Sequence, residues 1–320
     1  MRRKISYAKW GYIFLIPFFL VYAVFSLTPL LQTLIYSFID IKVDAGAVVS
    51  VRGGGGGSTN EVNNGFCGLA NYIDVLTGSK LFTSSLGNTV ALWLIGFIPQ
   101  IVMSLLLAVW FTDIRLKLKC QSFFKTVIYL PNVIMASAIS LLFYSLFTRG
   151  GALYDLICSI THTEDSWIDV PGGSRIIVGL INFMMWYGNT TIMLMAAILG
   201  IDTSLYEASQ IDGATPTQTF WQITIPLIKP ILAYVLVTSM IGGLQMYDVP
   251  YIIGGSAGGP KTVLMTLVSQ IQKGKKSAVG SVAALSMLIF VVSAVLGFIT
   301  LKVMDDDSIK TRYGKKKKKA

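Results

Sequence analysis

Charged residues are scarce in this sequence of 320 residues. Only 13% of its residues are Asp, Glu, Lys or Arg, which is about half the share that is usual in soluble domains. Hydrophobic residues make up 53%, and the mean hydropathy is +0.66. A water-soluble core is therefore not expected, and the composition indicates an integral membrane protein.

Residues that usually carry metal or nucleophilic chemistry are also few. No two of the cysteines Cys67, Cys120 and Cys158 stand in C-x-x-C spacing, which argues against zinc and redox chemistry. The single histidine, His162, lies in no recognisable catalytic triad, and the five glycines at 53–57 are not followed by the Gly-Lys-Ser/Thr of a phosphate-binding loop. We therefore expect no enzyme, no metal site, no bound cofactor and no nucleotide-binding site of the chain's own.

Six apolar runs are long enough to cross a bilayer, which needs about 20 residues each. They cover roughly residues 10–38, 86–111, 123–147, 176–199, 227–252 and 278–303. The sequence therefore predicts an all-α membrane protein with six transmembrane helices in a single domain over residues 1–320.

The net charge of +10 is distributed in clusters beside these runs. Basic residues precede the first run, lie between the second and third, and follow the last, as at Lys315–Lys319. The positive-inside rule places such clusters in the cytoplasm. We therefore expect a multi-pass protein of the cell membrane that contacts lipid and not nucleic acid. Both termini and the loop 201–226 should be cytoplasmic, and the loop 39–85, with its glycine-rich insert, should lie outside. Cys67 and Cys158 then share the outer side, and whether they pair stays open.

Ionisable residues are almost absent from the interiors of the six runs. Ion-coupled carriers usually need such groups at membrane depth, so their absence favours transport driven by a separate ATPase. An ion-coupled carrier or channel acting alone remains the alternative.

The polar segment 201–226 carries helix signals. Ser204 and Glu207 stand in capping-box spacing, and Gly213 suits the left-handed residue that ends a helix. Thr215, Pro216 and Gln218 repeat the start signal, and the Ile225-Pro226 pair predicts a further boundary. Two short helices with a glycine joint, followed by a new membrane helix, are expected.

The same segment resembles the "EAA" loop of ABC importer permeases. The resemblance rests on Glu207-Ala208-Ser209, on Gly213 and on Ile223-x-Ile225-Pro226; Ser209 and Ile225 replace the usual Ala and Leu. It implies the type I importer architecture, with a cytoplasmic coupling helix through which a separate ATPase drives the membrane subunit. The residues implied in coupling are Glu207, Ala208, Ser209, Asp212, Gly213, Ala214, Phe220 and Pro226.

Other stretches resemble the carbohydrate-importing, maltose-type branch of that family. They include 12–17, Gly68-Leu69-x-Asn71-Tyr72 and Tyr247-Asp248. The resemblance implies half of the translocation pathway for a di- or oligosaccharide. The implied partners are a second homologous permease, an extracytoplasmic sugar-binding protein and an ATPase dimer that uses ATP and Mg.

Polar and aromatic residues within the runs suggest a substrate path. Asn182, Trp186 and Asn189 share one helix face by their spacing, and Gln245 and Tyr247 lie in the fifth run. Amides suit sugar hydroxyls and aromatic faces suit sugar rings. Hydrogen bonding between helices is the alternative role of these residues.

Overall fold

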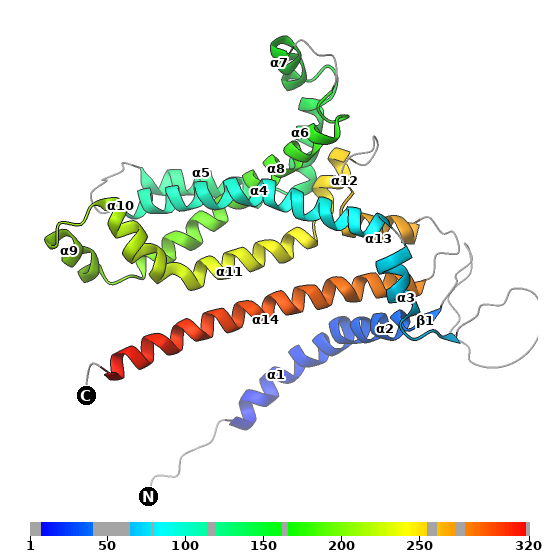
Figure 1. Cartoon of the computed structure of the whole chain (residues 1–320), viewed down its shortest axis with the longest axis horizontal. Coiled ribbons are helices and arrows are strands. Elements are labelled where there is room, and N and C mark those ends of the chain that lie inside the picture. Colours follow the sequence, from blue (N-terminus) through cyan, green and yellow to red (C-terminus); the bar gives the residue numbers. More distant parts are fainter. Residues whose placement is uncertain are drawn as a thin grey trace, which may run out of the picture. The chain divides into compact units, whose positions relative to one another are not determined.

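The computed structural model describes residues 8–40, 65–78, 80–113, 120–161, 166–254, 261–272 and 279–317. The glycine-rich insert, His162 and parts of the basic clusters, within 1–7, 114–119 and 318–320, lie outside these residues. The described part is mostly helical (Figure 1), which confirms the expected fold class.

Contacts divide the chain into two compact units. The first comprises Met1–Phe82 and Leu267–Val291, and the second comprises Thr83–Thr266 and Val292–Ala320. In chain order the helices are α1 (Ala8–Tyr22), α2 (Thr28–Ser37), α3 (Ala70–Ile73), α4 (Lys80–Thr112), α5 (Gln121–Val133), α6 (Ala136–Phe147), α7 (Ala152–Thr161), α8 (Pro171–Leu199), α9 (Thr203–Ile211), α10 (Pro216–Thr219), α11 (Ile225–Leu244), α12 (Asp248–Gly254), α13 (Val263–Gln272) and α14 (Val279–Lys317). Three π-helical turns, η1 (Ala23–Leu27), η2 (Asp74–Gly78) and η3 (Phe220–Thr224), and two short strands, β1 (Ile39–Asp40) and β2 (Gly65–Phe66), complete the described elements.

Within the described residues, five helices are long and apolar enough to cross a membrane, and a bent helix pair brings the number to six. The five are Tyr12–Ser37, Thr83–Thr112, Gly172–Leu199, Pro216–Leu244 and Val279–Ile299. These segments overlap the apolar runs of the sequence, because a bilayer-spanning segment must satisfy its backbone polar groups internally.

The third run, expected as one helix over 123–147, is broken. Helices α5 and α6 meet at an angle of 89°, because Ile134 and Met135 between them have extended backbone. The Asn132 side chain donates to the carbonyl of Met185 at 3.1 Å, which fixes the end of α5 on α8. The third run is therefore a bent pair of helices and not one continuous helix.

The fifth run ends earlier than expected. Helix α11 stops at Leu244 and the chain turns before α12 begins at Asp248, so the expected helix over 227–252 is two helices. The Thr262 hydroxyl donates to the Met246 carbonyl at 2.9 Å and satisfies a group that the break leaves outside a helix.

Two of the π-turns explain how Xaa-Pro pairs lie inside continuous helices. The backbone N–H of Thr28, before Pro29, donates to Ala23 O, and that of Ile225, before Pro226, donates to Phe220 O. Each bond spans five residues, and this wider turn accommodates a proline ring in the helix that follows. Helix α11 begins at Ile225, where a new helix was expected. It is not separated from α10, because η3 joins the two into one helical segment over Pro216–Leu244.

The core of the second unit lies between α4, α5, α6, α8, α11 and α12. One cluster of buried side chains includes Leu92, Ile139, Ile181 and Val249. Glycines allow the backbones to approach closely, because a Cβ at Gly188 of α8 would lie 2.1 Å from the carbonyl oxygen of Ile128 in α5. Small residues at such crossings are typical of membrane helix packing.

The first unit is organised around the side chain of Asn71. Its amide donates to the carbonyls of Ser37 and Ile39 at 3.0 and 3.2 Å and to Cys67 Sγ at 3.2 Å. Strands β1 and β2 pair antiparallel, with Ile39 opposite Phe66. Cys67 is a free thiol, as are Cys120 and Cys158, so the structure has no disulfide between Cys67 and Cys158.

Candidate coupling loop and translocation cavity

Helix α9 begins at an aspartate cap. Asp202 has extended backbone, and its side chain accepts the backbone N–H of Ser204 at 3.0 Å. This backbone hydrogen bond, followed by the side-chain bond from Ser204, holds the pKa of the Asp202 carboxyl below its ordinary value. The cap therefore stays ionised and in place as pH falls to that lowered pKa. The capping box expected at Ser204 and Glu207 was wrong, because Asp202 caps the helix two residues earlier.

The end of α9 confirms the role expected for Gly213. Gly213 has φ of +73°, its N–H donates to Gln210 O at 3.1 Å, and the N–H of Ala214 donates to Ser209 O at 3.0 Å. These two bonds form a Schellman motif, which needs a left-handed residue at its centre. The chain therefore reverses sharply after Asp212.

The second start signal is also confirmed. The Thr215 hydroxyl accepts the N–H of Gln218, and the Gln218 side chain accepts the N–H of Thr215 at 2.8 Å. With Pro216 in the first turn, this capping box starts α10. The loop is thus two capped helical segments joined by the turn at Gly213.

Hydroxyl groups hold α9 to the segment that follows it. The Tyr206 and Thr224 hydroxyls lie 3.2 Å apart, and those of Ser209 and Thr219 lie 3.3 Å apart. Ser209 is only 6% exposed. Behind these contacts is a cavity of about 190 Å³, bounded also by the ends of α4 and α8 at Thr112 and Leu199. This cavity lies between part of α9 and the ends of α4 and α8.

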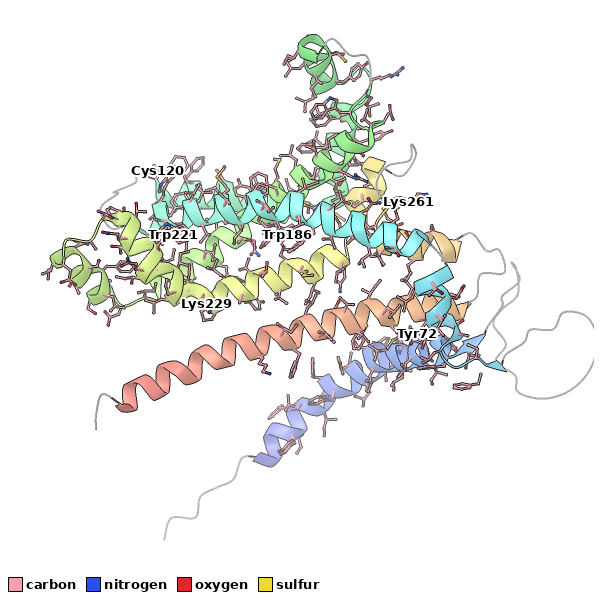
Figure 2. All side chains as sticks on the ribbon, in the orientation of Figure 1. Tyr72, Cys120, Trp186, Trp221, Lys229 and Lys261 are labelled. Carbon is pink, nitrogen blue, oxygen red and sulfur yellow. The ribbon has the colours of Figure 1, made fainter. Side chains whose placement is uncertain are left out.

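The opposite face of α9 is open. Glu207, Ala208, Asp212 and Gly213 are exposed, and Ile211 is 87% exposed. Of the other residues implied in coupling, Pro226 is exposed and lies in α11, while Ala214 and Phe220 are partly buried. Trp221, labelled in Figure 2, is 63% exposed beside them.

A buried cluster connects this loop to the long helices. It joins Ala108 of α4, Leu194 and Ile198 of α8, and Ile228 of α11, with Ile201 and Ile225 packed against it. The two ends of the loop, at Ile201 and Ile225, are therefore packed against a core shared by three long helices.

A second cavity, of about 330 Å³, lies between α4, α8 and α11. Trp186, labelled in Figure 2, faces it from the middle of α8. It is lined by Leu92, Trp93, Gly96, Phe97, Gln100, Asn182, Trp186, Asn189, Thr190, Met193, Tyr234, Val235, Thr238, Ser239, Gly242, Gly243 and Met246.

Hydrogen bonds fix several polar side chains of this cavity. Gln100 Nε2 donates to Thr190 Oγ1 at 2.7 Å, and Trp93 Nε1 donates to Ser239 Oγ at 3.0 Å. Asn182 Nδ2 donates to Val178 O at 2.8 Å and to Met246 Sδ at 3.4 Å. The rings of Trp93 and Phe97 stack with centroids 5.1 Å apart. The wall thus presents aromatic faces beside amide and hydroxyl groups.

Three of the five residues expected on the substrate path lie around one cavity in the structure. Asn182, Trp186 and Asn189 line this cavity, while Gln245 and Tyr247 do not. Tyr247 stacks on Tyr251 instead, at 5.2 Å, and both Gln245 and Tyr247 fall in the break after α11.

Two lining residues of α4, Trp93 and Gln100, were missed from the sequence. Trp93 fits the apolar run in which it lies, but Gln100 interrupts it, and a glutamine in a membrane span is unfavourable unless its amide finds partners or water. That cost was the signal that could have identified Gln100.

Membrane-spanning helices around an uncharged polar cavity, together with a capped helical loop at one end of the bundle, define a membrane transport subunit. The chain belongs to the family of binding-protein-dependent transport system inner membrane components, whose model matches residues 89–306. It is 30% identical over 259 residues to the lactose transport system permease protein LacF of Rhizobium radiobacter, covering 80% of each chain. It is 25% identical to the multiple sugar-binding transport system permease protein MsmF of Streptococcus mutans, over 94% of this chain and 97% of that one.

A solved structure has the same fold. It is a bacterial ABC transporter involved in the import of the acidic polysaccharide alginate, with a TM-score of 0.74 and 19% identity over 93% of this chain and 95% of that one. The family match confirms the resemblance to ABC importer permeases, and the likeness to this structure confirms the fold that the resemblance implied.

Proposed function

We propose that this chain is the membrane-spanning subunit of an ATP-driven, binding-protein-dependent importer for a di- or oligosaccharide. The observation that carries the proposal is the family match over residues 89–306, which contains both the cavity and the loop 201–226. Relatives named for lactose and for multiple sugars support a sugar as the substrate. The family match lends no support to an ion-coupled carrier acting alone.

The partners follow from the same proposal. A binding protein delivers the sugar from outside, a second permease supplies the other half of the path, and an ATPase dimer uses ATP and Mg. The structure of the alginate transporter in complex with a pentasaccharide-bound periplasmic protein supports the first of these. This chain needs no nucleotide site or cofactor in that assembly, and both of its termini lie in the cytoplasm.

The loop 204–226 is the proposed contact with the ATPase. The exposed face of α9 around Glu207 and Ile211 would seat in a groove of that partner, since short amphipathic helices bind through one face. When ATP closes the ATPase dimer, α9 moves with it. The buried cluster at Leu194 and Ile228 then carries the motion into α4, α8 and α11.

The sugar is proposed to pass the cavity lined by Asn182, Trp186 and Asn189. Its volume of about 330 Å³ is at the lower end of the range for small-ligand sites, as expected for one half of a shared path.

The test is ATP-dependent uptake by the purified complex in proteoliposomes, with the binding protein supplied outside. Omission of the binding protein or the ATPase should abolish uptake. Uptake that persists without the ATPase and follows an imposed proton or sodium gradient would overturn the proposal.

A further inference from the structure

We infer that this chain's side of the path accepts uncharged sugar units and rejects sugar carboxylates. The inference rests on the proposed function and makes its substrate class more specific. It follows from the chemistry of the lining residues and from the directions in which their amides are held.

The cavity carries no charge on its wall. All of its lining residues belong to the described part of the chain, and none of them is Asp, Glu, Lys, Arg or His. A carboxylate removed from water needs a cation or several aligned donors, and without them its burial is strongly unfavourable. Sugar hydroxyls both donate and accept, so they can pair with amides and hydroxyls.

The orientation of Gln100 is fixed by its neighbour. The Thr190 hydroxyl has a single hydrogen, which it donates to the Trp186 carbonyl at 3.0 Å. Thr190 Oγ1 can therefore only accept from Gln100, so the amide nitrogen must face Thr190. Among the described residues no group donates to Gln100 Oε1, and this acceptor remains for a ligand.

The side-chain amide of Asn182 is oriented in the same way, with its nitrogen bound to protein groups and its oxygen left over. Its nitrogen donates to the Val178 carbonyl, which can only accept, and to the sulfur of Met246. Both N–H groups are used, so only Oδ1 remains. Two fixed carbonyl oxygens favour hydroxyl donors and repel a carboxylate, which can only accept.

The remaining polar groups are neutral and mixed. Asn189 makes no hydrogen bond to any described residue, and the same holds for the indole N–H of Trp186 and the hydroxyl of Tyr234. These groups can donate to a sugar, but none supplies positive charge. The stacked rings of Trp93 and Phe97 add an aromatic surface suited to the CH face of a pyranose.

The test measures ligand binding in the cavity directly and leaves out the binding protein, because the binding protein has its own specificity. Cys67, Cys120 and Cys158 are replaced by serine, and Met193→Cys places one thiol on the lining. The complex of both permeases and the ATPase, without binding protein, is treated with an uncharged methanethiosulfonate reagent. Lactose, arabinotriose and maltotriose are compared with trigalacturonate as protecting ligands.

At least one neutral sugar should slow modification of the thiol introduced by Met193→Cys. The concentration that it needs should be at least tenfold lower than the concentration of trigalacturonate that gives the same protection. Asn189→Lys, which breaks no hydrogen bond, should remove that preference, while Asn189→Gln should keep it. Equal or better protection by trigalacturonate, or protection by no neutral sugar, overturns the inference. Loss of ATP-driven uptake for every sugar overturns the proposed function instead, so the two failures are distinguished.

Discussion

The hydroxyl oxygens of Ser209 and Thr219 lie 3.3 Å apart and join α9 to α10 across the turn at Gly213. Because the Ser209 hydroxyl also donates to Tyr206 O at 2.8 Å, the hydrogen between Ser209 and Thr219 comes from Thr219. Together with the Tyr206–Thr224 contact, this bond sets the angle at which α9 is presented.

Thr219→Val removes that donor and keeps the shape of the side chain. The loss of one such bond costs about 1 kcal/mol, so insertion and assembly of the complex should be unchanged. Stimulation of the ATPase by loaded binding protein should fall several-fold, because α9 is no longer held at its angle. Thr217→Val, at an exposed position of α10, is the matched control. Equal stimulation in the two variants would show that the hydroxyl pair has no role in coupling.

Gly213→Pro should abolish transport. Proline cannot adopt a φ of +73°, so the Schellman turn is lost and α9 is redirected. Gly213→Ala should have a smaller effect, because nothing lies within 4 Å of the added Cβ and only the left-handed backbone, at about 1–2 kcal/mol, opposes it.

The control for this pair is Gly200→Ala, since Gly200 also ends a helix but has φ of −78°. Stimulated ATPase activity and sugar uptake are measured in all three variants. Normal stimulation with Gly213→Pro would contradict the role given to this turn.

Glu207→Arg should uncouple the two subunits without unfolding α9. Glu207 is exposed and takes no part in the cap, which Asp202 provides. A reversed charge on the proposed contact face should lower ATPase association by tenfold or more in a pull-down of the purified subunits. The control is Thr217→Arg, which places a positively charged side chain on α10 in place of a neutral one and should keep the association. Retained association in Glu207→Arg would place the ATPase elsewhere.

The loop 201–226 should react with thiol reagents only from the cytoplasm. Ile211→Cys in a cysteine-free background is the suitable reporter, because residue 211 is 87% exposed, whereas Ser209 is buried. An impermeant maleimide should label it in inverted vesicles but not in intact cells. Leu156→Cys on α7, which is 55% exposed, should show the reverse pattern; labelling of position 211 in intact cells would refute the topology.

Substitutions at the adjacent glycines Gly242 and Gly243 distinguish a role of Trp93 in transport from a general effect on helix packing. A Cβ at Gly243 would lie 2.7 Å from the Trp93 ring, while a Cβ at Gly242 would meet nothing within 4 Å. Gly243→Ala should displace the indole and break its bond to Ser239, with an overpacking cost of about 1–3 kcal/mol. Uptake should fall in Gly243→Ala and persist in Gly242→Ala. Equal uptake by both would remove Trp93 from the proposed path.

Much of the fold was predictable because bilayer crossing imposes length and apolarity on each helix. The breaks between α5 and α6 and between α11 and α12 were not predictable in this way. Ile134 and Met135 are apolar, and neither carries a local signal for extended backbone; the bend is held by Asn132 and the packing of α6 on α12, which are tertiary contacts. At Ile225-Pro226 a new helix was expected and α11 does begin there, but the π-turn that joins it to α10 was not predicted.

The loop was predicted best where local chemistry decides the structure. Gly213 and the Thr215–Gln218 box depend only on neighbouring residues, and both were confirmed. Asp202 and Ser204 are both good capping residues and lie only two positions apart, so the sequence pattern did not decide between them. The cavity depends on which faces of α4, α8 and α11 meet. For this reason Trp93 and Gln100 were missed, and Gln245 and Tyr247, expected beside Asn182, lie instead in the break after α11.

The most direct test of the account is ATPase activity and sugar uptake measured together in proteoliposomes that hold both permeases and the ATPase. Loaded binding protein should stimulate both activities with the natural chain, and Gly213→Pro should lose both while the assembled complex remains intact. Uptake that survives in Gly213→Pro, or that continues without ATP, would contradict coupling through α9.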